Sequence, residues 1–234
     1  MLKREIKLTQ DGSPTIYLPE WEESYHSKHG ALQEAEHVFI KNGLEHFKDQ
    51  DEIVILEYGF GTGLNALLTL LVSEKQGNVI EYHSLEKFPI TDHEVQQLPL
   101  AKQMAAHFNL DLAKVSSYYE KLHNAPWNEK IKITEQFYLK KIQADFRYPT
   151  IEPNFYNLIY FDAFGKRVQP NLWTEEVFDI AFKALKDNSL FTTYACNGTT
   201  KRALAQVGFT VEKISGPPGK REMINAWKNQ LNHS

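Results

Sequence analysis

A strand, a glycine-rich turn and a helix follow one another early in the chain, and this unit constrains the fold more than any other segment. Residues 53–56 are apolar and mostly β-branched, residues 57–63 read Glu-Tyr-Gly-Phe-Gly-Thr-Gly, and residues 64–72 are typical of a helix. Glycine permits positive φ and close approach of a ligand, and the N-terminus of a helix offers free N–H groups. The unit predicts a ligand-binding turn in an α/β protein.

Two other interpretations of this turn stay open at the level of its residues. It can be an ordinary tight connection between strand and helix. It can also be a dinucleotide-binding turn, although that pattern needs a small residue where the chain has Leu64, and Gly63 comes one residue early.

The rest of the chain alternates between strand and helix patterns. Apolar or alternating runs predict strands at residues 79–85, 131–142 (a pair), 156–161, 189–195, 209–214 and 222–227, and helical periodicity covers residues 92–108, 174–185 and 199–207. Residues 116–128 fit neither pattern. Residues 4–18 predict a hairpin, and residues 30–47 a helix interrupted at Asn42-Gly43. Such alternation predicts a mostly parallel sheet that binds ligands at the carboxyl ends of its strands.

Length and composition limit the classes of protein to consider. The 234 residues suit one large α/β domain with a small addition. No apolar run approaches the ~20 residues of a membrane-spanning helix, so we expect a cytoplasmic protein without a membrane partner. With one cysteine and no Cys/His pair at zinc spacing, we expect no metal. The net charge of −4 argues weakly against nucleic-acid binding, but basic pairs occur late in the chain, including Lys220-Arg221.

Acidic residues stand at the ends of three successive predicted strands. Glu57 begins the glycine turn, Glu86 ends the second strand and Asp145 follows the third. An acid in the position of Glu86 accepts hydrogen bonds from ribose hydroxyls in several cofactor classes. Each acid alone fits a helix cap or a surface position equally well. Their joint placement predicts a cofactor site.

Several segments together carry a resemblance to a known family. The glycine turn led by an acid resembles motif I of the class I methyltransferases. The chain further resembles the methyltransferase half of the bifunctional bacterial enzyme that completes 5-methylaminomethyl-2-thiouridine at the tRNA wobble position, and its stand-alone relatives. The segments that carry this likeness are residues 26–34 (His-Ser-Lys-His-Gly-Ala-Leu-Gln-Glu), 57–65, 85–89 (Leu-Glu-Lys-Phe-Pro), 162–173 and 220–223 (Lys-Arg-Glu-Met).

The resemblance implies a fold and a cofactor. The fold is α/β and Rossmann-like, with a seven-stranded mostly parallel sheet, helices on both faces and a small N-terminal β-hairpin. Residues 1–48 would form the hairpin and helix extension, and residues 49–234 the class I methyltransferase domain. The implied cofactor is S-adenosylmethionine, with Glu57 near its methionine ammonium and Asp145 near its adenine. The residues that would hold it are Glu57, Gly59, Phe60, Gly61, Thr62, Gly63, Asn65, Glu86, Lys87 and Asp145.

The resemblance also implies a reaction, namely N-methylation of 5-aminomethyl-2-thiouridine at the wobble position of the tRNA anticodon loop. Asp162 would orient the substrate amine and accept its proton. The residues that would contact the substrate are His29, Phe164, Trp173, Lys220 and Arg221. Residues 162–173 depart from the family pattern, which usually has a proline soon after the phenylalanine, where this chain reads Gly165-Lys166-Arg167. The 234 residues leave no room for the flavin-dependent half, so we expect the oxidoreductase activity on a separate protein.

Two alternative functions remain from the sequence. A small-molecule N- or O-methyltransferase would use the same cofactor site and suits the acidic net charge. A non-catalytic nucleotide-binding scaffold would use the glycine turn without Asp162.

Overall fold

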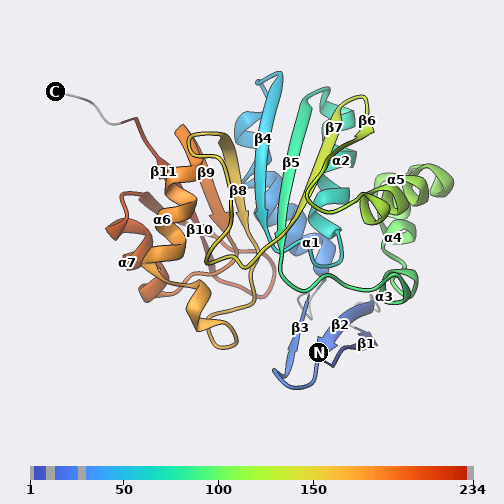
Figure 1. Ribbon diagram of the computed structural model, residues 1–234, viewed down its shortest axis with the longest axis horizontal. Helices are drawn as coiled ribbons and strands as arrows, with labels where there is room; N and C mark the ends of the chain where they lie inside the picture. Colours follow the sequence, from blue (N-terminus) through green and yellow to red (C-terminus); the bar gives the residue numbers. More distant parts are fainter. Residues whose placement is uncertain (1–2, 9–13, 26–29, 231–234) are drawn as a thin grey trace.

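Eight strands form the central sheet of the computed structural model, which describes residues 3–8, 14–25 and 30–230 (Figure 1). Five neighbouring strands are parallel, and antiparallel strands flank them on both sides. From edge to edge the order is β10 (Thr210–Ser215), β11 (Glu222–Lys228), β9 (Leu185–Thr193), β8 (Tyr156–Phe161), β4 (Glu52–Tyr58), β5 (Val79–Glu86), β7 (Phe137–Gln143) and β6 (Lys130–Thr134).

The predicted α/β fold with a mostly parallel sheet is confirmed, but the count of seven strands implied by the resemblance is wrong. The pair predicted at residues 131–142 is present as β6 and β7, and β6 adds an antiparallel edge strand to a sheet of eight. The single helix predicted at residues 92–108 is also wrong. It is divided into α3 (Asp92–Gln96) and α4 (Leu100–Phe108) at Pro99, which lacks a backbone N–H and disfavours helical geometry in the residue before it.

Helices cover both faces of the sheet because successive strand residues point to opposite sides. Ile53 and Ile55 of β4 join one apolar cluster, whereas Leu56 and Tyr58 join the other. The helical segments whose residues pack in the first cluster are α1 (Ala31–Ala35), η1 (Glu36–Lys41), η2 (Leu44–Phe47), α2 (Leu64–Gln76), α3, α4 and α5 (Leu112–Asn124); η3 (Pro170–Leu172), α6 (Glu175–Ala184) and α7 (Gly198–Gln206) pack in the second. The ambiguous residues 116–128 thus lie largely in α5.

A small antiparallel sheet lies at one end of the large one (Figure 1). It consists of β1 (Glu5–Leu8), β2 (Pro14–Leu18) and β3 (Glu23–Ser24), so the predicted hairpin is present and gains a third short strand. The turn of the hairpin at residues 9–13 lies outside the described residues. Residues of α1 and η1 share the core of the large sheet. The division at residue 48 stays a prediction.

Candidate active site

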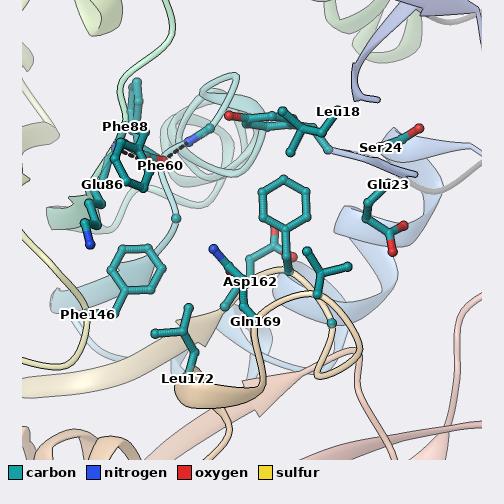
Figure 2. A pocket seen from close by; sticks show the side chains of 18 of the residues that line it. Leu18, Glu23, Ser24, Phe60, Glu86, Phe88, Phe146, Asp162, Gln169 and Leu172 are labelled. Carbon is teal, nitrogen blue, oxygen red and sulfur yellow. Dashed lines mark hydrogen bonds between the residues drawn. The ribbon is translucent and has the colours of Figure 1, made fainter. Parts of the chain in front are cut away.

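A cavity of about 670 Å³ opens at the carboxyl ends of the parallel strands, where β4 lies between β5 and β8. Figure 2 shows Glu86 and Phe146 on one side of it and Glu23 and Ser24 of β3 on the other. The sequence-predicted residues that line it are Gly59, Phe60, Gly61, Thr62, Asn65, Glu86, Lys87, Asp145, Asp162, Phe164 and Lys220. Glu57, Gly63, Trp173 and Arg221 are not among its lining residues. His29 lies outside the described residues.

The glycine turn bends between β4 and α2 in a way that side chains at two positions would prevent. Gly59 has φ of 107°, and a Cβ there would lie 3.2 Å from the carbonyl oxygen of Asp162. Gly61 has φ of 50°, and its Cβ would lie 3.2 Å from the ring of Tyr25. The turn therefore packs closely against the backbone of Asp162, just after β8, and against the ring of Tyr25.

Glu86 ends β5 and fixes the glycine turn. The Gly61 N–H donates to Glu86 Oε2 at 3.1 Å, and the Phe88 N–H donates to Oε1 at 2.8 Å. Burial raises the pKa of Glu86, and these backbone donors oppose the increase. The carboxylate is thus held between two loops at the cavity wall.

Asn65 links the two carboxylates nearest to the centre of the sheet. Its Nδ2 donates to Asp162 Oδ2 at 2.8 Å and to Glu57 Oε1 at 3.1 Å. Glu57 also accepts a 2.6 Å hydrogen bond from Ser84 and is almost fully buried. Glu57 does not line the cavity itself, and its hydrogen bond to Asn65 connects it to Asp162, which does.

Burial controls the charge of both carboxylates. It raises the pKa of Glu57 to about 8. The hydrogen bonds from Ser84 and Asn65 oppose this increase, and the negative charge of Asp162 adds to it. Burial raises the pKa of Asp162 to about 7, where the Asn65 donor opposes the increase, Glu34 adds to it and Lys220 lowers it. A carboxyl group that exchanges a proton near neutral pH is suited to acid–base chemistry.

Asp145 follows β7 and is held by cations. Arg147 donates to both of its oxygens, and Lys87 Nζ lies 2.8 Å from Oδ2. The hydrogen bonds from Arg147, assisted by Lys87, hold the pKa of Asp145 well below its usual range. Lys87 thus lines the cavity as the partner of Asp145.

The predicted substrate-contacting aromatics occupy different environments. Phe164 lines the cavity, and its ring packs edge-on against Tyr25 and Trp21 with centroids 5.1 and 5.6 Å away. Trp173 is only 2% exposed, and its indole N–H donates to the carbonyl of Phe164 at 2.8 Å. Trp173 therefore supports the Phe164 loop from the core.

The basic pair Lys220-Arg221 is divided between two surroundings. Lys220 lines the cavity, forms an ion pair with Glu34 and lies 3.9 Å from the centroid of the Tyr194 ring. Arg221 is exposed outside the cavity. Sequence reasoning included Glu34 in a family-like segment without assigning it to the site, and it missed Tyr194.

In the described part of the chain, no three His, Cys, Asp or Glu side chains are grouped to hold a metal ion. None of its helices has the length and hydropathy needed to cross a membrane.

Comparisons with known proteins identify the family of the chain. The model of a family described as S-adenosyl-L-methionine-dependent methyltransferase matches residues 102–229. Relatives from Burkholderia pseudomallei and Burkholderia mallei, both named tRNA 5-methylaminomethyl-2-thiouridine biosynthesis bifunctional protein MnmC, are 29% identical over 230 residues. The match covers 92% of this chain and 34% of theirs, so the chain spans about a third of their length.

A solved structure shares the fold. The crystal structure of MNMC2 from Aquifex aeolicus matches with a TM-score of 0.75 and 23% identity, over 98% of this chain and 71% of that one.

Proposed function

Since the chain belongs to the family of S-adenosyl-L-methionine-dependent methyltransferases, we propose that it methylates the primary amine of 5-aminomethyl-2-thiouridine at the wobble position of tRNA. Asp162 carries this proposal. It is a partly buried carboxylate directly after β8 that lines the cavity, and desolvation raises its pKa to about 7. The names of the relatives that match 92% of the chain support the choice of tRNA over a small molecule.

The described residues fit the cofactor. The glycine turn brings backbone to the cavity wall, and the buried Glu86 offers a carboxylate there for ribose hydroxyls. Asn65 Oδ1 is buried without a hydrogen-bond partner among the described residues, so it is available to a donor on a ligand. We assign the methionine end to the Asn65 side and the adenine end to Asp145 and Phe146. When bound, S-adenosylmethionine supplies a methyl group on a positively charged sulfur, and the methyl group passes to the lone pair of a neutral amine.

Asp162 makes the amine available in that neutral form. An alkylammonium resembles lysine, with an unperturbed pKa of about 10.4, so it enters the cavity protonated. A nearby carboxylate alone would raise the pKa of the amine, whereas removal from water lowers it. Asp162 binds and orients the ammonium, and it accepts the proton as the amine becomes desolvated.

The aromatic wall of the cavity suits a nucleobase. Tyr25 and Trp21 each pack edge-on against Phe164, and all three residues line the cavity together with Asp162. Uridines flipped out of an anticodon loop are commonly bound by stacking on such rings. We assign uridine binding to Phe164 in particular.

The proposal includes a setting for the reaction. Formation of the free amine is a different reaction, which we assign to a separate oxidoreductase. We place the protein in the cytoplasm, where tRNA is modified.

The experiment combines a cellular and a purified assay. Mass spectrometry of tRNA nucleosides from cells that lack the gene should detect the unmethylated aminomethyl form. The purified chain, given that tRNA and S-adenosylmethionine, should convert it to the methylaminomethyl form. Methylation of small amines with no conversion of the tRNA would favour the small-molecule alternative. Absence of S-adenosylmethionine binding would favour the scaffold.

A further inference from the structure

Glu34 and Lys220 form an ion pair inside the cavity that the proposed function does not use. Glu34 lies in α1 and Lys220 in the turn before β11, 186 positions away in the chain. The Glu34 side chain is 15% exposed, and Lys220 Nζ binds its Oε1. Its other oxygen, Oε2, is buried and has no hydrogen-bond partner among the described residues. A desolvated carboxylate oxygen without a donor is costly unless a ligand supplies one.

This ion pair lies at the Asp162 end of the cavity. The charge of Glu34 raises the pKa of Asp162 and the charge of Lys220 lowers it, so both side chains lie near that carboxyl. Tyr194 connects the groups, because its hydroxyl donates to the carbonyl of Ala163 at 2.8 Å while its ring faces Lys220. The substrate amine would therefore meet two carboxylates, Asp162 and Glu34, instead of one.

We propose that Glu34 is the second hydrogen-bond acceptor for the substrate amine and that it stops the reaction after one methyl group. The inference rests on the proposed function. Glu34 acts here as a residue that determines product specificity, while Asp162 remains the proton acceptor.

The chemistry of the amine explains how two acceptors limit the reaction to one methyl transfer. A primary ammonium loses one proton through Asp162 to solvent, and the neutral amine then has two N–H bonds and one lone pair. With the N–H groups directed to Asp162 and Glu34, the lone pair points to the methyl carbon. The new N–C bond uses that lone pair, and the sulfur keeps the electrons of the broken S–C bond. The product keeps both N–H groups on the same carboxylates.

A second transfer would require a different arrangement. One of the two N–H protons would have to leave, and the nitrogen would have to turn so that its lone pair again points to a methyl donor. The first methyl would then occupy the place of an N–H. A charged N–H···O contact is roughly 2.8 Å long, whereas a methyl needs about 3.3 Å or more between carbon and oxygen in addition to the N–C bond. The carboxylate oxygen would also lose the N–H donor of the amine. Polar sites reject substrate analogues that lack a hydrogen-bonding group for the same reason.

Lys220 keeps the acceptor in place. Its bond to Oε1 holds the carboxylate in one orientation, and its charge offsets the repulsion between Glu34 and Asp162. Oε2 remains buried and without a hydrogen-bond partner among the described residues.

The test measures which nucleoside is formed. Wild type, Glu34→Ala and the double variant Glu34→Met/Lys220→Met receive aminomethyl tRNA or methylaminomethyl tRNA with excess S-adenosylmethionine. Replacing both partners of the ion pair with apolar side chains of similar length avoids an unpaired charge if Glu34→Ala fails to fold. Glu36→Ala is the matched control, because Glu36 begins η1, which directly follows α1, and pairs with His107 on the surface. Nucleoside mass spectrometry separates mono- from dimethylated product.

We expect wild type and Glu36→Ala to form only the monomethyl product. The Glu34 variants should raise the ratio of second to first transfer roughly tenfold to a hundredfold, the scale for an unpaired buried acceptor. Monomethyl product alone from the folded Glu34 variants would overturn the inference, and so would loss of the first transfer in both with cofactor binding intact. If wild type itself does not methylate the tRNA, the proposed function fails instead.

Discussion

Asn65 donates a 2.8 Å hydrogen bond from its side-chain amide to Asp162 Oδ2. The same nitrogen donates to Glu57 Oε1, so one amide group is shared by a buried carboxyl and the carboxyl that lines the cavity. Because a donor to the ionised form lowers a carboxyl pKa, Asn65 works against the burial of Asp162.

Loss of this hydrogen bond should move the pH dependence of the reaction. In Asn65→Ala, the pKa of Asp162 rises further above its usual range, so the proton acceptor becomes available only at higher pH. The midpoint of the single-turnover rate against pH should shift upward from the wild-type value near 7. Asn225→Ala is the control, since Asn225 is also buried and its side chain donates to the carbonyl of Asn42, away from Asp162 in the hydrogen bonds of the described residues. A midpoint that stays at the wild-type pH would exclude this role.

Asp162 should matter for methyl transfer far more than for cofactor binding. Asp162→Asn keeps the shape and removes the proton acceptor, so we expect a rate loss on the order of 10²-fold or more. Wild-type activity should rise with pH through about 7, because the carboxyl must be ionised, and the variant should lack this step. Calorimetry should give nearly unchanged S-adenosylmethionine affinity. A variant that methylates at the wild-type rate near neutral pH would show that the proton leaves by another route.

The glycine turn is tested by a bulky side chain at Gly61. Gly61→Val combines positive φ with a contact on the Tyr25 ring and should abolish S-adenosylmethionine binding in calorimetry. Gly77→Val is the matched control, because Gly77 also has positive φ but no atom lies within 4 Å of its Cβ position. Both variants should lose about 1 kcal/mol or somewhat more of stability from backbone strain. Equal affinity in the two variants would remove the turn from the cofactor site.

Glu57 should make stability depend on pH. Its folded pKa of about 8 lies above the ordinary value of 4.5. Its contribution to the free energy of unfolding is therefore fully present below pH 4.5 and is lost as pH rises through 8. Glu57→Gln does not ionise, so its melting temperature relative to wild type should increase between pH 5 and pH 9. A difference that is constant across this range would mean that Glu57 titrates normally.

Lys220 and Arg221 should behave differently toward tRNA. If exposed Arg221 contacts a phosphate, Arg221→Ala should lower the slope of log affinity against log salt by about 1. Lys220→Ala should leave this slope unchanged, because Lys220 is paired with Glu34 in the cavity. Lys75→Ala, an exposed lysine at the end of α2, serves as the control. Equal slopes for wild type and Arg221→Ala would make Arg221 an ordinary surface residue.

Sequence reasoning succeeded where the determinant is local. The glycine turn and the carboxylates Glu86, Asp145 and Asp162 follow directly from strand ends, because every parallel strand ends at the same edge. The placement of Glu34 beside Lys220 depends on the packing of α1 against the turn before β11, and no local pattern encodes that contact. Trp173 lies in the core and is not among the lining residues, and the sequence alone does not distinguish this placement from one in the cavity, because it depends on tertiary packing.

The direction of β11 has a practical consequence. β9 ends at Thr193, at the cavity edge of the sheet, where Thr193 pairs with Ile224 of β11. Because β11 is antiparallel to β9, it ends at Lys228, which pairs with Ser189 away from the cavity. The other end of the chain stays near the opening, because Arg4 next to β1 lines the cavity and donates to the carbonyl of Phe88. A surface tether attached after Lys228 would therefore leave the opening free for tRNA in immobilised binding assays, whereas one attached ahead of Arg4 would stand in its path.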